Sequence, residues 1–307
     1  MGDPSGIGPE IIIKSLSDNK ILRSAHITVI GDYFVIDKVK RAVRSKAEFS
    51  LLDLSNVPSR NFSFGKHDPS FGKASIEYIN KALHVIREGG ADALVTAPVN
   101  KSSIRGSGFT DFKGHTEYLA AKTGTKDFAM MFVGKQLKIT LVTRHLALKD
   151  VANSITMESV YKTIILTAEY LKKFFHLKAP RIGVAGLNPH AGDNGSFGDE
   201  EERIIKPAIK MASSKIKNIS GPIAPDAVFF EAFSGSFDAV VAMYHDQALA
   251  PFKTLYFFDG VNLTLGLPFI RTSPDHGTAF DIAGSGIADA LSMKEAILLA
   301  GRLAKKV

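Results

Sequence analysis

The chain of 307 residues contains no cysteine, which excludes disulfide bonds, thiolate nucleophiles and cysteine-type zinc sites. A bound metal ion would therefore depend on histidine, aspartate or glutamate side chains. The sequence also lacks a signal peptide and any apolar run of about 18 residues, so we expect no membrane partner and a cytoplasmic location. It has no internal repeat, and its 45% of hydrophobic residues is typical of a globular protein.

The charge balance is mildly basic, since 38 lysines and arginines against 31 aspartates and glutamates give a net charge of +7. Nucleic-acid binding would require a clustered basic patch interleaved with aromatic residues, but the positive residues are spread along the chain. We therefore expect no nucleic-acid partner. A preference for anionic small molecules explains the excess equally well.

Predicted strands and helices alternate along the sequence. Short apolar runs predict strands at residues 27–30, 93–96, 129–133, 138–142, 181–185 and 239–243. Helical periodicity predicts helices at residues 33–44, 72–88, 151–175 and 200–215. The strands 129–133 and 138–142 are expected to pair across a tight turn. The alternation indicates an α/β protein with a largely parallel sheet, long enough for two lobes.

Three histidines share one sequence context, because His145, His190 and His245 each lie just past the end of an apolar run. Strand ends of an open α/β sheet converge on its ligand site. A single histidine is commonly a satisfied structural residue, but three in matching positions favour a divalent metal site. Asp246 is then a natural partner that orients a histidine ligand, and Asn188 is another candidate.

Several residues suit an anionic ligand. Lys253, Asn262 and Arg271 follow the last predicted strand and are suited to holding phosphate or carboxylate. His115 and Thr116 precede a helical stretch, where free backbone N–H groups also attract anions. The alternative for Thr116 is that it only caps this helix.

The first ten residues, MGDPSGIGPE, form a glycine-rich turn that enters a helix. They do not match the dinucleotide fingerprint GxGxxG, and a plain strand-to-helix turn is an equally good interpretation. Such a turn normally follows a strand, and none precedes it here. We therefore expect the natural start to lie upstream of Met1.

Motifs along nearly the whole chain resemble the 4-hydroxythreonine-4-phosphate dehydrogenase family of pyridoxal-phosphate biosynthesis. They are MGDPSGIGPE, APVNK, GHTE, TRH, GLNPHAGDNGSFGDEE, YHDQ, PFK and HGTAFDIAG, in the family's order. One departure is GPIAPD at residues 221–226, where the family usually has GPxPAD. The resemblance implies an isocitrate/isopropylmalate dehydrogenase-like fold, with two α/β/α lobes, a mostly parallel sheet and a central crevice. A cofactor-side lobe would comprise residues 1–125 plus 262–307, and a dimerisation and metal-site lobe residues 126–261.

The resemblance also implies roles for individual residues. The metal ligands would be His145, His190 and His245, and the substrate-binding residues would be His115, Thr116, Lys253, Asn262 and Arg271. The loop that binds the adenosine side of NAD, or NADP, would contain His276, Gly277, Thr278, Ala279, Asp281 and Gly284. One divalent cation per site is implied, whether zinc, magnesium, manganese or cobalt, in a homodimer that shares its active site. For the general base the candidates are Asp246, Lys101, Asp226 and a metal-bound water.

The implied reaction is the oxidation of 4-phosphohydroxy-L-threonine to 2-amino-3-oxo-4-phosphooxybutanoate. Decarboxylation to 3-amino-2-oxopropyl phosphate follows. The alternative within enzymes is a paralogue that oxidises 4-phospho-erythronate or 4-phospho-threonate, which the same motifs would serve. A non-catalytic anion- or nucleic-acid-binding protein is favoured only by the positive charge, and it leaves the three histidines unexplained.

Overall fold

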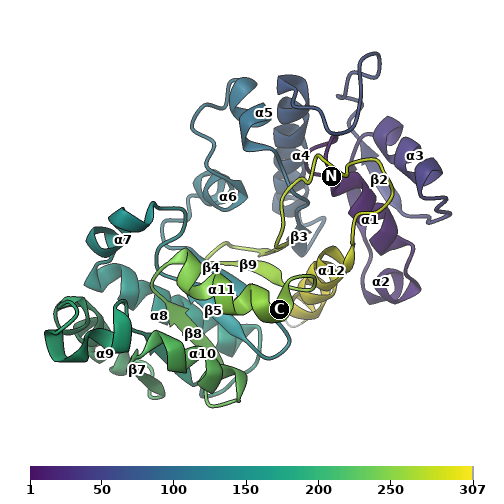
Figure 1. The fold of residues 1–307 in the computed structure, drawn as a ribbon. Coiled ribbons are helices and arrows are strands. Elements are labelled where there is room, and N and C mark those ends of the chain that lie inside the picture. Colours follow the sequence, from purple (N-terminus) through teal and green to yellow (C-terminus); the bar gives the residue numbers. More distant parts are fainter. Residues whose placement is uncertain (306–307) are drawn as a thin grey trace. The chain divides into compact units, whose positions relative to one another are not determined.

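The computed structural model describes residues 1–305 and confirms the α/β class, with helices and strands alternating along the chain (Figure 1). The chain divides into two compact units. The first unit comprises Met1–Gly124 and the residues from Pro268 onward, and the second comprises Thr125–Leu267. The segment that carries Asn262 therefore belongs to the second unit, although the sequence placed the return to the first lobe at residue 262.

The first unit contains two parallel strand pairs. Strand β1 (Thr28–Gly31) pairs with β2 (Ser50–Asp53), and β3 (Ala93–Val95) pairs with β10 (Ile270–Pro274). Its helices are α1 (Gly8–Leu16), α2 (Asn19–Ser24), α3 (Tyr33–Ala42), α4 (Pro69–Arg87), α5 (Lys101–Gly106), α6 (His115–Thr123) and α12 (Leu291–Ala304).

The core of the first unit is built around α1. Ile13 and Leu16 of this helix are fully buried, and they belong to the same cluster as Val35 of α3, Phe71 of α4 and Met293 of α12. Helical spacing places such residues on one face, which the surrounding helices then cover. The helix that follows the glycine-rich turn is therefore central to its unit.

The second unit is built on a run of strands in the order β9-β4-β5-β8-β6-β7. Their bounds are β4 (Ala129–Val133), β5 (Lys138–Leu141), β6 (Ile182–Ala185), β7 (Ile219–Ile223), β8 (Ala239–Ala242) and β9 (Val261–Leu265). Strand β4 is antiparallel to β5 and β9, which confirms the predicted pairing of 129–133 with 138–142. The pairs β5–β8, β8–β6 and β6–β7 are parallel.

Helices cover both faces of this sheet: α7 (Leu148–Ser154), α8 (Met157–Lys173), α9 (Lys206–Ser213), α10 (Pro225–Phe233) and α11 (His245–Tyr256) (Figure 1). Side chains of β8 alternate between two cores. Ala239 and Val241 pack with residues of α8 and α9, whereas Val240 and Ala242 pack with residues of α10 and α11. Alternation of side chains along a strand buried on both faces explains the continuous apolar run in the sequence.

Two predicted helices are wrong in detail. The helix expected at 151–175 is two helices, α7 and α8, because Ile155 has extended backbone and Thr156 caps the second helix. The Thr156 side chain accepts from the Ser159 N–H at 3.1 Å while the Ser159 hydroxyl accepts from the Thr156 N–H at 3.0 Å. This reciprocal capping box starts a new helix. The helix expected at 200–215 opens with a π-helical turn, Glu201–Ile205, before α9.

Within residues 1–305, no helix combines the length and the apolar composition that crossing a membrane would require.

Candidate functional site

Three neighbouring parallel strands of the second unit end at one edge of the sheet, and each is followed by one of the predicted histidines. His145 follows β5, His245 opens α11 directly after β8, and His190 follows β6. We call this the histidine edge. The apolar runs end here because the strands leave the core, which is where open α/β sheets place their ligand sites.

His145 and His245 lie side by side at the histidine edge, with ring centroids 5.9 Å apart. The Nδ1 atom of His245 lies 2.8 Å from a carboxylate oxygen of Asp246. A carboxylate accepts, so Nδ1 carries the proton and Nε2 is left as the ligand atom. Gln247 fixes the start of α11, because it accepts from the Met243 N–H and donates to the Gly186 carbonyl oxygen, both at 2.7 Å. These two imidazoles have the donor chemistry of a divalent metal site.

His190 is not beside the other two histidines. Its ring lies 6.2 Å from that of Phe197, and among residues 1–305 there is no group of three histidine, aspartate or glutamate side chains placed to bind one metal ion. The reason is local. Residues 190–194 all have φ between 41° and 82°, so the chain makes a left-handed turn directly after Pro189. The described chain therefore assembles two of the three predicted ligands, and His190 is exposed.

The remaining predicted residues of the second unit lie apart from the histidines. Lys253 is eight residues after His245 on α11, which corresponds to about 12 Å along the helix axis. Asn262 is the second residue of β9, which runs parallel to β5, so it lies toward the opposite end of the sheet from His145. The Asn262 side-chain oxygen is buried and accepts no hydrogen bond. Asp226 is exposed in the first turn of α10, just after β7.

In the first unit, Arg271 is the centre of a buried polar group, which we call the arginine cluster. Its guanidinium donates to the Thr96 hydroxyl from Nη2 at 2.6 Å and from Nε at 3.1 Å, and to the Thr116 hydroxyl at 3.5 Å. The Arg271 residue is only 3% exposed, and this burial lowers its pKa to about 10, with Glu117 acting in the opposite direction. The charged, planar donor groups of this guanidinium are suited to binding an anion.

The N-terminus of α6 belongs to the arginine cluster. The cap position of this helix is Gly114 and no side chain caps it, so the interpretation of Thr116 as a cap is wrong. Burial lowers the pKa of His115 well below its usual value, and the charges of Arg271 and Lys101 lower it further. His115 is therefore neutral near pH 7 and can donate to an anion. The Lys101 ammonium is close by, since a Cβ added at Gly114 would lie 3.9 Å from it.

Thr96 was missed as a site residue. It closes the apolar run of residues 93–96, a position that predicts only the end of a strand. Its hydroxyl accepts from Arg271, because β3 and β10 are paired in parallel and Thr96 extends β3 beside Thr272. A polar residue at the end of a buried parallel strand was the available signal.

The predicted cofactor loop, residues 276–284, lies against the glycine-rich turn at the start of the chain. The Ile7 N–H donates to the Thr278 carbonyl oxygen at 2.9 Å, and a Cβ added at Gly6 would lie 3.1 Å from Thr278. Gly277 faces open space, and Asp281 is exposed. Backbone at Gly277 and the Asp281 carboxylate are thus accessible to a nucleotide, and these groups fit a ribose hydroxyl.

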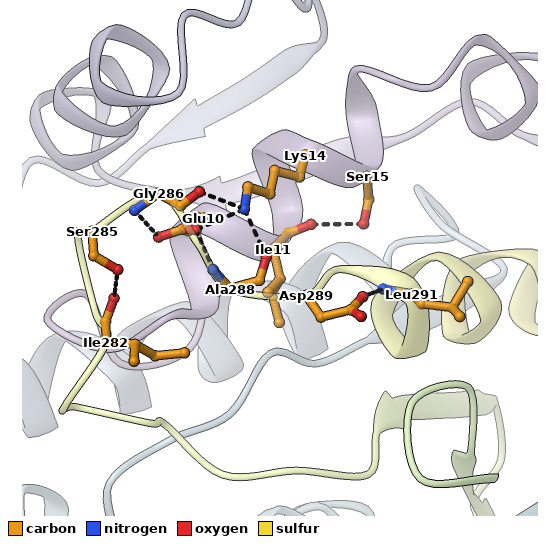
Figure 2. A network of polar contacts seen from close by, with 10 residues as sticks. All are labelled: Glu10, Ile11, Lys14, Ser15, Ile282, Ser285, Gly286, Ala288, Asp289 and Leu291. Atoms are coloured by element: carbon orange, nitrogen blue, oxygen red, sulfur yellow. Dashed lines mark hydrogen bonds and ion pairs between the residues drawn. The ribbon is translucent and has the colours of Figure 1, made fainter.

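Figure 2 shows how α1 holds the downstream end of this loop. The buried Glu10 carboxylate accepts from the N–H groups of Ala288 at 2.8 Å and of Gly286 at 3.2 Å. The Lys14 ammonium donates to the carbonyl oxygens of the same two residues at 2.7 and 2.8 Å, and it lies 3.0 Å from Glu10. The ion pair of Glu10 and Lys14 therefore binds the N–H and carbonyl groups of both Gly286 and Ala288, just after the loop.

Comparisons with known proteins identify the family to which the chain is similar. The family model of the pyridoxal phosphate biosynthetic protein PdxA matches residues 11–300. A 4-hydroxythreonine-4-phosphate dehydrogenase from Desulfosudis oleivorans is 45% identical, over 98% of this chain and 93% of its own. A relative from Oceanobacillus iheyensis, whose name contains the words D-threonate 4-phosphate dehydrogenase, is 43% identical, over 99% of this chain and 96% of its own. The crystal structure of 4-hydroxythreonine-4-phosphate dehydrogenase from Klebsiella pneumoniae matches with a TM-score of 0.89 and 39% identity, over 99% of this chain and 96% of that one.

Proposed function

The chain belongs to the family of the pyridoxal phosphate biosynthetic protein PdxA, and from this membership we propose that it oxidises 4-phosphohydroxy-L-threonine. The oxidant is NAD or NADP, and a divalent cation is required. The product, 2-amino-3-oxo-4-phosphooxybutanoate, then loses carbon dioxide to give 3-amino-2-oxopropyl phosphate. The observation that supports this proposal most strongly is the pair of imidazoles of His145 and His245, with Asp246 bonded to the second.

The histidine edge would hold the cation, which when bound would polarise the substrate hydroxyl and make its proton more acidic. Zinc, cobalt, manganese and magnesium are all candidates. The nicotinamide, when bound, would supply a hydride acceptor for the carbinol carbon, and a side chain acting as base would take the hydroxyl proton. Asp246 is one candidate for this base, but its bond to His245 makes it better suited to orienting the ligand. Lys101 and Asp226 remain candidates.

The arginine cluster would bind an anionic end of the substrate. Arg271 supplies a charged, planar donor, and neutral His115 can donate beside it. Lys253 would supply a second cation, about 12 Å along α11 from the histidine edge. The buried, unbonded Asn262 oxygen fits a donor group of a ligand.

A second copy of the chain would complete the metal site. His190 is exposed and stands away from His145 and His245 within one chain, so it is free to reach a site on a partner. A symmetric homodimer would then contain two equivalent sites, each with ligands from both subunits.

The test is a substrate panel followed by the absorbance of reduced cofactor, with NAD and NADP in separate reactions. We expect turnover with 4-phosphohydroxy-L-threonine, loss of turnover after chelation, and recovery with added Zn²⁺, Mn²⁺, Co²⁺ or Mg²⁺. Full activity after exhaustive chelation, with no metal detected in the protein, would remove the metal from the mechanism.

A second candidate is oxidation of D-threonate 4-phosphate or its erythronate isomer, supported by the name of the relative from Oceanobacillus iheyensis. This substrate has a hydroxyl where 4-phosphohydroxy-L-threonine has an amine. The phosphate and the reacting hydroxyl are common to both, so the same panel separates them by the ratio of their kcat/KM values.

A further inference from the structure

The left-handed turn that carries His190 needs support from its surroundings. His190, Ala191, Asp193 and Asn194 all have φ between 41° and 54°, a region that residues with a Cβ rarely occupy. Consecutive residues in this conformation persist only when neighbouring groups hold them there. The turn is exposed on its outer side, so the support has to come from beneath it.

Glu201 provides that support. Glu201 is only 1% exposed, and its Oε1 accepts from the backbone N–H groups of Leu187 at 2.7 Å and Asn188 at 2.8 Å. Its Oε2 accepts from the Asn188 side-chain amide at 3.0 Å. One carboxylate thus fixes two of the three residues that connect β6 to Pro189.

Two glycines make room for this carboxylate. A Cβ added at Gly192 would lie 2.7 Å from Oε2 of Glu201, and one added at Gly186 would lie 3.1 Å from its Oε1. Gly192 is in the middle of the left-handed turn, so the carboxylate contacts both the entry and the centre of the turn. Glu201 itself is on the π-helical turn that opens the next helix, which sets its position independently of the loop.

We propose that Glu201 is a positioning residue for His190, and that it sets the affinity of the protein for a divalent cation. The inference rests on the proposed function only in taking His190 as a metal ligand. Glu201 acts through the backbone of the loop and does not itself bind the metal. Groups that orient a ligand in this way typically change metal affinity by about 10- to 100-fold when they are removed.

The adjacent residue offers a matched control. Glu200 also accepts from the Asn188 side-chain amide, at 2.8 Å, but no bond from it to the loop backbone accompanies this contact. Glu200→Ala and Glu201→Ala therefore remove the same charge and a bond to the same amide, and only the second removes the backbone contacts. Titration with Co²⁺ alone, followed by its visible absorbance, compares them on the full-length protein.

We expect Glu201→Ala to raise the Kd for Co²⁺ by about 10- to 100-fold and Glu200→Ala to change it less than about threefold. The Kd for NAD should stay within about twofold in both variants, because a positioning role acts on one ligand only. Hydrogen exchange of residues 187–195 should rise in Glu201→Ala, with little change in β6. If Glu201→Ala does not fold, Glu201→Gln, which keeps one acceptor oxygen, should show a smaller rise in the same Kd.

A double-mutant cycle with His190→Ala decides whether the effect passes through this histidine. In the His190→Ala background, Glu201→Ala should have no further effect on Co²⁺ affinity. An unchanged Kd in Glu201→Ala alone, or the same loss in both backgrounds, would overturn the inference. If His190→Ala itself leaves Co²⁺ binding unchanged, the metal-site assignment fails instead, and the two failures are thereby distinguished.

Discussion

Replacement of Arg271 by methionine should lower the affinity for substrate while changing the free energy of unfolding little. The lowered pKa, about 10, means that burial of this cation destabilises the folded protein by about 3 kcal/mol. The folded state holds the proton less tightly than the unfolded state. This destabilisation is therefore complete below pH 10 and is relieved only as the pH rises above it. A bound phosphate or carboxylate would offset it.

Methionine removes the destabilisation, but it also removes the bonds to the Thr96 and Thr116 hydroxyls. Bonds from a charged donor contribute about 1.5–3 kcal/mol, so the two effects nearly cancel. We expect the free energy of unfolding of Arg271→Met to stay within about 2 kcal/mol of the wild type, without ligand. Substrate affinity should fall about ten- to a hundredfold from the lost charge-assisted contact.

Calorimetric titration with 4-phosphohydroxy-L-threonine and separately with NAD provides the affinities, and thermal unfolding provides the stability. Arg87→Met is the matched control, because this exposed guanidinium donates to the Lys122 carbonyl oxygen in the same unit. It should change neither affinity. Strong destabilisation of Arg271→Met with unchanged substrate affinity would refute the reasoning, because Arg271 would then be structural.

Three further predictions concern other parts of the molecule. Burial raises the pKa of Asp3 to about 6, so the folded state binds this proton more tightly than the unfolded state does, and the free energy of unfolding should fall as the pH rises from 4 to 6. Unfolding in urea at pH 4.5 and at pH 7 should show this fall, and the Asp3→Asn variant should lack it. Glu10→Gln should weaken NAD binding, measured by fluorescence titration, because Glu10 binds the backbone just after the predicted cofactor loop, and Co²⁺ binding should stay unchanged. The control Lys294→Met removes a different ion pair of the same unit and should affect neither affinity. His190→Ala and His245→Ala should each be inactive, but mixed after unfolding and refolding they should regain about a quarter of wild-type turnover, since random pairing makes about half the dimers mixed. Mixed dimers, identified by mass spectrometry, that show no activity would contradict a shared site.

The location of the histidine edge was predictable because a short run of apolar residues indicates a buried strand whichever apolar residues compose it. The runs before His145, His190 and His245 are β5, β6 and β8, and these strands are neighbours in the sheet. Parallel strands present their carboxyl ends at one edge, so sequence position alone indicated a common location. The family resemblance drawn from the same motifs is confirmed by the family model and the relatives.

The path of the chain after β6 was not predictable. His190, Ala191, Asp193 and Asn194 all lie in the left-handed region, and such a run is rare even though histidine, aspartate and asparagine adopt this conformation more readily than most residues. We attribute the turn to the carboxylate of Glu201, which accepts from the Asn188 N–H at its entry. Strand β7 was missed for a related reason. Its sequence, ISGPI, contains glycine and proline, which are depleted in strands, and pairing with β6 overrides that preference.

The supporting role of Glu10 and Lys14 was also hidden. Their spacing of four residues is the ordinary pattern of an exposed helical ion pair. In the structure Glu10 is 1% exposed and the pair binds the backbone of Gly286 and Ala288, far along the chain. Only the tertiary fold brings these segments together, so a local pattern could not reveal the contact.

The central claim is that this chain catalyses a metal-dependent oxidation followed by decarboxylation. The most direct measurement is the stoichiometry of reduced cofactor and carbon dioxide released from 4-phosphohydroxy-L-threonine, with and without a chelator. Equal amounts of the two products, both lost on chelation and restored by Co²⁺ or Zn²⁺, are the predicted result. Cofactor reduction without carbon dioxide release, or turnover that chelation leaves intact, would contradict it.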